Sequence, residues 1–164
     1  MPSRGFTLLE MAFVLAVIGV LLAAGMPASG RLLERQRLQA AADALAQDLR
    51  HARELALQSQ QPVHLRFARH DDKIWCRGVS RGQPCDCSGA SALPACNVSQ
   101  VDSSDHAHVR LASAQDASFD PRLGSAPLNG RTVFATPDGQ QWPVALSALG
   151  RAHSGIDSKA EGTR

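Results

Sequence analysis

The chain has 164 residues, of which 44% are hydrophobic and 20% charged, and its formal net charge is +2 at pH 7. This length allows one domain of ordinary size with its own core beside a short N-terminal segment, and it argues against a multidomain enzyme. The small net charge gives no indication of a nucleic-acid partner.

The first segment of the chain is apolar, with no charged residue between Met11 and Met26. As a helix, Phe6 to Met26 would span about 31 Å at ~1.5 Å per residue, close to the thickness of the hydrocarbon core of a bilayer. A secretory signal peptide is the simpler interpretation, with Arg4 before the apolar run and a small-residue cleavage zone at Ala23–Gly25.

One acidic residue, Glu10, interrupts this apolar segment. A carboxylate in hydrocarbon costs on the order of 3 kcal/mol, so Glu10 is expected to have a cationic partner. No Lys or Arg lies within helical reach on the apolar side. Cleavage after Gly5 would create an α-amino group at Phe6, and in a packed bundle this amine of one subunit would meet Glu10 of its neighbour.

The order Gly5-Phe6-Thr7-Leu8-Leu9-Glu10, followed by an apolar helix, resembles the type IV pilin and type II secretion pseudopilin class. The resemblance implies that prepilin peptidase removes a leader of residues 1–5 and methylates Phe6, and that Glu10 sets the register of filament assembly. It further implies a single-pass protein of the bacterial inner membrane, with residues 6–27 in the membrane or filament core. Its partners would be other pilins or pseudopilins and an inner-membrane assembly platform.

Residues 28–61 are predicted to form an amphipathic helix. Between Arg31 and Gln61 there is no Gly or Pro, and apolar residues recur at steps of three and four from Leu38 to Ala56. Pro27 would allow a kink where the membrane segment ends, or would simply end the first helix. Pro62 closes the second helix.

The end of this helix resembles one subgroup, the family of pseudopilin H and the minor pilin FimT. The resemblance lies in Ala52-Arg53-Glu54-Leu55-Ala56, an Ala-Arg-x-x-Ala run before the first strand. Arg53 itself is expected to be a solvated charge, paired with Glu54 or with a filament neighbour.

Residues 62–164 are predicted to form a β-rich globular domain, which gives an α+β fold: a long N-terminal helix packed on a small antiparallel sheet. Alternation at Val63–Phe67 is typical of a half-buried strand. Further strands are expected at Lys73–Cys76, Val109–Leu111, Thr132–Ala135 and Gln140–Val144, with a turn at Pro137–Gly139. The family resemblance covers the N-terminal 70 residues and, more weakly, Thr132 to Arg151, and it does not extend to Arg77–Asp120.

All four cysteines, Cys76, Cys85, Cys87 and Cys96, lie in the segment 76–96, a density typical of disulfides in an oxidising compartment such as the periplasm. A bridge between Cys85 and Cys87 would be strained. This leaves Cys76–Cys85 with Cys87–Cys96, or the crossed pairing, and each bridge would contribute about 3 kcal/mol. A four-thiolate zinc site would need two closely spaced pairs, and only one is present.

No catalytic, metal or cofactor motif is found among the six histidines and the possible nucleophiles. His106 and His108 stand in a polar run, where a solvated loop is expected. The protein is therefore expected to be a structural subunit without a cofactor.

Two functions fit these patterns. The first is a FimT-like minor pilin at the tip of a type IV pilus, aiding DNA uptake; the second is pseudopilin H of a type II secretion system. FimT proteins resemble one another in a C-terminal Gly-Arg-x-Arg motif, and this chain has Gly150-Arg151-Ala152-His153, with a mostly neutral His at the second basic position. The candidate DNA-binding residues are Arg151, His153, Lys159 and Arg164.

Overall fold

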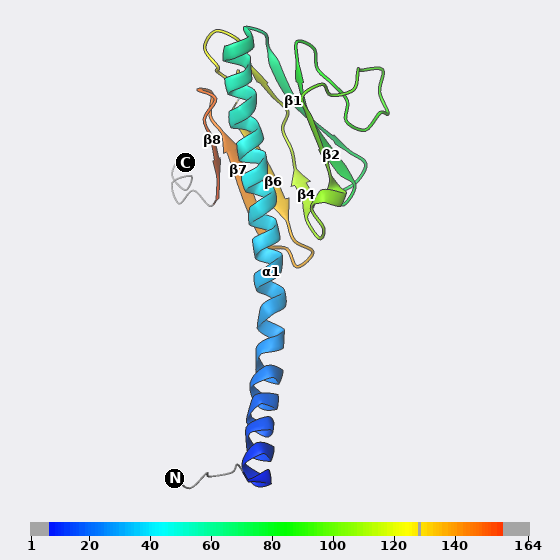
Figure 1. Cartoon of the computed structure of the whole chain (residues 1–164). Coiled ribbons are helices and arrows are strands. Elements are labelled where there is room, and N and C mark those ends of the chain that lie inside the picture. Colours follow the sequence, from blue (N-terminus) through cyan, green and yellow to red (C-terminus); the bar gives the residue numbers. More distant parts are fainter. Residues whose placement is uncertain (1–6, 128, 156–164) are drawn as a thin grey trace, which may run out of the picture. The chain divides into compact units, whose positions relative to one another are not determined.

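The computed structural model describes residues 7–127 and 129–155, with the side chains of residues 22–29 left undescribed. The chain divides into two compact units, Met1–Glu34 (unit 1) and Arg35–Arg164 (unit 2). One helix, α1 (Leu8–Ser59), forms the described secondary structure of unit 1 and continues as the first element of unit 2 (Figure 1).

The part of α1 in unit 2 is amphipathic. Its buried side is made of leucines and alanines at steps of three and four: Leu38, Ala41, Ala42, Leu45, Ala46, Leu49, Ala52 and Ala56. The opposite side, including Asp43, Gln47 and Glu54, is exposed. The helix ends because Gln60 adopts a left-handed conformation with φ of 52° and Pro62 has no N–H to continue the ladder.

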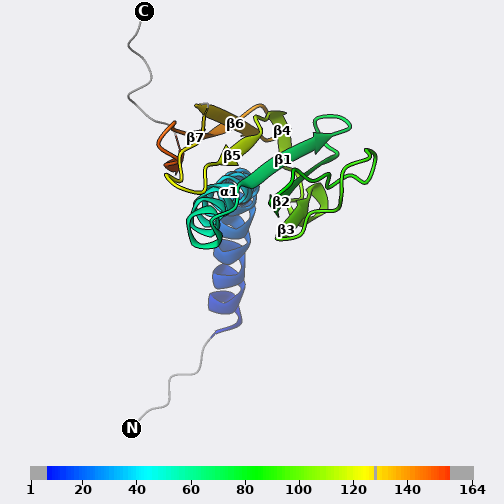
Figure 2. The same ribbon diagram turned by 90° about the horizontal axis from the view of Figure 1, so that it is seen from above.

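Two four-stranded antiparallel sheets make up the rest of unit 2 (Figures 1 and 2). The first has the order β3 (Ser99–Asp102), β2 (Trp75–Arg81), β1 (Val63–Arg69) and β5 (Ala117–Phe119). The second has the order β4 (Arg110–Ser113), β6 (Gly130–Ala135), β7 (Gln141–Leu146) and β8 (Ala152–Ser154), and a 3-10 helix, η1 (Ser103–Asp105), precedes β4. The predicted α+β fold is therefore confirmed, with two small sheets rather than one.

Both sheets share one core with α1. Val63 and Leu65 from β1, Phe134 from β6 and Val144 from β7 are all at most 2% exposed and belong to the same cluster as the apolar side of the helix. Because that side is mostly alanine, both sheets can approach the helix backbone closely.

The cysteines form two disulfides, Cys76–Cys87 and Cys85–Cys96, which is the crossed pairing of the two alternatives. Cys76–Cys87 ties the loop between β2 and β3 back to β2, and Cys85–Cys96 joins two points within that loop. The side chain of Asn97 reinforces this closure, since its Oδ1 accepts from the N–H of Arg81 at 2.9 Å and its Nδ2 donates to the carbonyl of Arg81 at 3.3 Å.

Gly78, in the middle of β2, lies directly beneath one of these bridges. A Cβ at this position would overlap Cys96 Sγ and lie 3.2 Å from Cys85 Sγ. We therefore expect Gly78→Ala to displace the Cys85–Cys96 bridge and to lower the free energy of unfolding by about 2 kcal/mol, less than a lone bridge because the other disulfide already closes an overlapping loop. Maleimide labelling followed by mass spectrometry should count two free thiols in the variant.

Gly130→Ala is the matched control for this substitution. Gly130 also lies in a strand, but its added Cβ would be 3.6 Å from Leu146 Cβ, an ordinary contact. The control should show no free thiols. A fully oxidised Gly78→Ala protein would contradict the prediction, because it would show that the Cys85–Cys96 bridge tolerates the added Cβ.

Candidate functional site

Glu10 lies in the first turn of α1 with an exposed side chain. Its N–H donates to Thr7 Oγ1 at 3.3 Å, so Thr7 caps the start of the helix and Glu10 occupies the third helical position. A carboxylate here is also favoured by the positive end of the helix dipole. Within the described residues Glu10 takes part in no ion pair, which leaves its charge available at the start of the helix.

The side chains around Glu10 and after it are apolar and exposed on every side of the helix. Leu8 is 89% exposed, Phe13 68% and Val20 69%, and the others with large exposed area are Leu9, Met11, Val14, Leu15, Val17, Ile18 and Leu21. A continuous apolar surface of this kind marks a site of contact with a membrane or with other proteins.

Among the helical residues that the structure describes, no helix combines the length and the apolar character required to span a bilayer. The predicted cleavage and methylation residues, Gly5 and Phe6, lie outside the described residues. Pro27 lies within α1, and the kink there stays a prediction.

Arg53 does not behave as the solvated charge expected from the sequence. It is partly buried, and its Nε donates to the carbonyl oxygen of Gly124 at 3.0 Å. A Cβ at Gly150 would overlap that same carbonyl oxygen and lie 3.0 Å from Arg53 Cδ. Both glycines have positive φ, of 60° and 73°. Arg53 therefore joins α1 to two loops. This contact is a structural role for the Arg of the Ala-Arg-x-x-Ala run.

The candidate DNA-binding residues are only partly described. Arg151, just before β8, and His153, within β8, are both exposed, and the residue between them, Ala152, is buried. The backbone of Arg151 closes the β7–β8 turn, with its carbonyl accepting from the N–H of Ser147 at 3.0 Å. Lys159 and Arg164 lie outside the described residues, and a DNA contact at this end stays a prediction.

An ion pair between the buried Arg77 and the partly buried Asp48 links α1 to the first sheet, and no sequence pattern indicated it. Arg77, on β2, is 2% exposed, and its Nε donates to Asp48 Oδ2 at 2.8 Å. Its Nη1 is buried with no hydrogen-bond partner among the described atoms. Beside this pair, burial and the charge of Arg77 lower the pKa of His106, whose ring stacks on Trp75 at a centroid distance of 6.0 Å.

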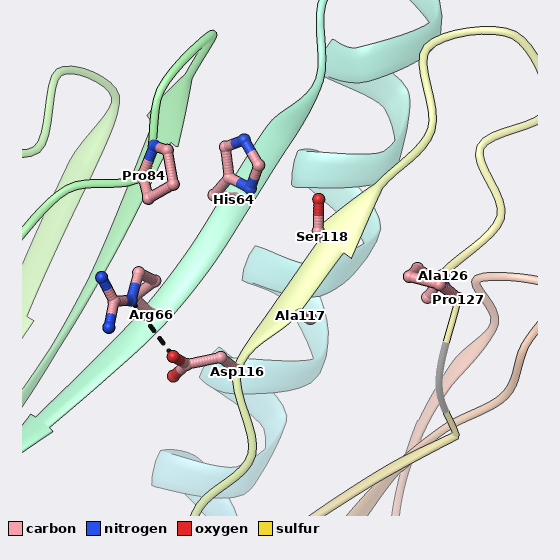
Figure 3. Close-up of a pocket in the computed structure, with 8 residues that line it drawn as sticks. All are labelled: His64, Arg66, Pro84, Asp116, Ala117, Ser118, Ala126 and Pro127. Atoms are coloured by element: carbon pink, nitrogen blue, oxygen red, sulfur yellow. Dashed lines mark hydrogen bonds and ion pairs between the residues drawn. The ribbon is translucent and has the colours of Figure 1, made fainter.

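A cavity of about 260 Å³ lies along β1 and β5 (Figure 3). His64, Asp116 and Ser118 line it, the residue types of a hydrolase triad. However, Asp116 is engaged by Arg66 at 3.1 Å and by the N–H of Phe67 at 2.9 Å. In the described residues no hydrogen bond joins His64 to Asp116 or Ser118, so this cavity lacks the geometry of a triad.

Comparison with known families gives two matches. Residues 41–150 match the family described as type II transport protein GspH. Residues 1–26 match the prokaryotic N-terminal methylation motif. A search of curated proteins finds no match to the chain.

Two crystal structures of the type IV minor pilin FimU from Pseudomonas aeruginosa share the fold. The structure in space group P21 is 24% identical with a TM-score of 0.54, covering 78% of this chain and 95% of that one. The structure in space group P65 is 22% identical with a TM-score of 0.50, covering 74% and 95%.

Proposed function

This chain belongs to the family of the type II transport protein GspH, and from this premise we propose that it is a non-enzymatic subunit of a pilus-like filament, anchored in the bacterial inner membrane before assembly. Unit 1 would be the anchor and the filament core, and unit 2 would stand in the periplasm. Prepilin peptidase and an inner-membrane assembly platform are its proposed partners, together with other pilins or pseudopilins.

One observation carries this proposal: the helix of unit 1 exposes apolar side chains all round and begins with a carboxylate, within a segment that matches the methylation motif. Water would not stabilise such a surface, whereas hydrocarbon or a bundle of like helices would cover it. In either environment Glu10 needs a positive partner, and the Phe6 amine of a neighbouring subunit would supply one.

Within this family we propose a minor pilin of a type IV pilus, with the type II secretion pseudopilin as the alternative. The likeness of the fold to a minor pilin supports the first choice. Deleting the gene should then reduce surface pili and leave secretion of exoproteins unchanged, and the reverse result would favour the alternative. If the pilus also takes up DNA, Arg151→Ala should weaken binding of duplex DNA to the full chain for all sequences alike.

The mature protein is expected to begin at a methylated Phe6. Cleavage after Gly5 gives Glu10 the amine it needs, and only a residue without a side chain leaves the peptide bond open to a peptidase at the membrane face. Top-down mass spectrometry of the membrane-extracted protein measures the N-terminus directly.

Gly5→Leu provides the matched comparison, since it should retain residues 1–5 and lack the methyl group. A native N-terminus at Met1, or one beyond Ala23, would contradict the filament proposal, because the latter result would remove Glu10 altogether.

A further inference from the structure

A second cavity of unit 2, of about 270 Å³, gathers basic side chains from separate segments of the chain. Lys73 comes from the β1–β2 turn, His106 and His108 from the segment after η1, and Arg110 from β4. Pro137, in the β6–β7 turn, closes the cavity, and no acidic side chain is among the residues that line it. We propose that this cavity binds a phosphate group, either of a phospholipid headgroup or of free phosphate.

The turn that carries Lys73 is held in place by its own hydrogen bonds. Asp71 Oδ1 accepts from the N–H groups of Lys73 at 2.7 Å and Ile74 at 2.6 Å. These bonds lower the pKa of the Asp71 carboxyl, so the turn keeps its charged acceptor well below neutral pH. The backbone that presents Lys73 is therefore fixed before any ligand arrives.

The segment that carries the histidines is also ordered. Asp102 and Asp105 form a reciprocal capping box around η1, and the N–H of Val109 donates to the carbonyl of His106 at 3.1 Å. His108 adopts φ of 66°, an uncommon conformation for a residue with a side chain. The strained backbone at His108 lies in the wall of the cavity.

The guanidinium of Arg110 has N–H donors available for an anion. Its Nη1 donates to Asp72 Oδ2 at 3.4 Å, with the two side chains 35% and 50% exposed, so this ion pair is weak. A guanidinium carries five N–H donors, and its planar fork matches the oxygens of a phosphate. Lys73, which is exposed, contributes a second full charge.

The cavity lies at the end of unit 2 where the chain enters through Arg35. Trp142, shortly after the β6–β7 turn, has the guanidinium of Arg35 5.9 Å from its ring centroid. β1 starts directly after the C-terminal end of α1 and runs antiparallel to β2, so the turn with Lys73 lies at the opposite end from Ser59 (Figure 1). Phospholipid headgroups are one source of phosphate for a membrane-anchored chain, and the phosphate chemistry of the site does not depend on that assignment.

Trp75 provides a reporter for this site because its ring stacks on His106. The full chain, purified in an uncharged detergent, would carry Trp142→Phe so that Trp75 is its single tryptophan. Titrations would use inorganic phosphate and short-chain dihexanoylphosphatidylglycerol, with sodium chloride at equal ionic strength as the reference. Both probes should give a saturable change in Trp75 emission. Tighter binding of the lipid would identify a headgroup as the source, and equal affinities would identify phosphate itself.

The variant Lys73→Gln/Arg110→Gln should weaken both affinities about tenfold, the loss expected for removing charge-assisted hydrogen bonds at a partly exposed site. Arg122→Gln/Arg131→Gln removes the same charge from exposed positions elsewhere and should leave both affinities unchanged. No saturable emission change, or an equal loss in both variants, would overturn the proposal. A saturable change with an acidic peptide but with neither phosphate probe would also overturn it, because this result would indicate a protein partner. Because no step requires a filament, failure here leaves the proposed function standing.

Discussion

Replacing Glu10 with alanine is expected to stop the chain from entering a filament while unit 2 stays folded. The side chain is exposed at the start of α1, among apolar neighbours that a filament would bury. Losing a charge pair in that environment costs on the order of 3 kcal/mol, or about a hundredfold in the equilibrium of incorporation. Immunoblotting of sheared filaments against the membrane fraction measures it.

Glu10→Gln separates the charge from the cap of the helix. Glutamine keeps the ability of this position to complete a capping box with Thr7, but it has no charge with which to form an ion pair with an amine. Both variants should therefore be lost from filaments to the same extent. Normal incorporation of Glu10→Gln would show that Glu10 acts by capping α1 and not by its charge.

Replacing Asp48 with leucine is expected to lower the free energy of unfolding by about 3 kcal/mol, because Arg77 would then be a buried and unpaired cation. Arg77 is 2% exposed, and its Nη1 already lacks a hydrogen-bond partner among the described atoms, so water cannot replace the lost carboxylate. The value is set at the low end for a broken buried pair because Asp48 is itself 26% exposed. Denaturant unfolding of the full chain in detergent measures it.

The double variant Asp48→Leu/Arg77→Met should recover most of this loss, since apolar residues of similar size can replace a buried ion pair with little cost. Asp72→Asn, which breaks the exposed pair with Arg110, should cost less than about 1 kcal/mol. If the double variant is no more stable than Asp48→Leu alone, the cost arises from lost packing and not from the unpaired charge.

Elements with a strong local pattern were predictable from the sequence. The apolar spacing from Leu38 to Ala56 identified the helix, and alternation identified β1, which the structure extends to Arg69. The strand expected at Lys73–Cys76 was placed too early, because Asp71 holds Lys73 and Ile74 in a turn and β2 starts at Trp75. β2 is also buried almost throughout, so it lacks the alternation of a half-buried strand.

The rest depended on contacts between distant parts of the chain. β3, β5 and β8 have only three or four residues each, too few for a period to appear. From the sequence alone, Arg77 is expected to be a polar residue of a loop. Its burial is possible because Asp48, on the helix, supplies the opposite charge. The cavity with Lys73 and Arg110 likewise arises only when β4 is brought to the β1–β2 turn, where the N–H of Leu111 donates to the carbonyl of Asp72 at 2.8 Å.

The crossed order of the two disulfides determines whether the chain stays in one piece when a protease cuts the loop that they close. A single cut before Cys85 leaves the fragments joined by Cys76–Cys87, and a cut after Cys87 leaves them joined by Cys85–Cys96. A cut at Asp86 leaves them joined by both bridges, whereas the sequential pairing would let them separate there. Exposed loops are where proteases cut first, and in this one a nick anywhere between Cys76 and Cys96 leaves a single covalent molecule.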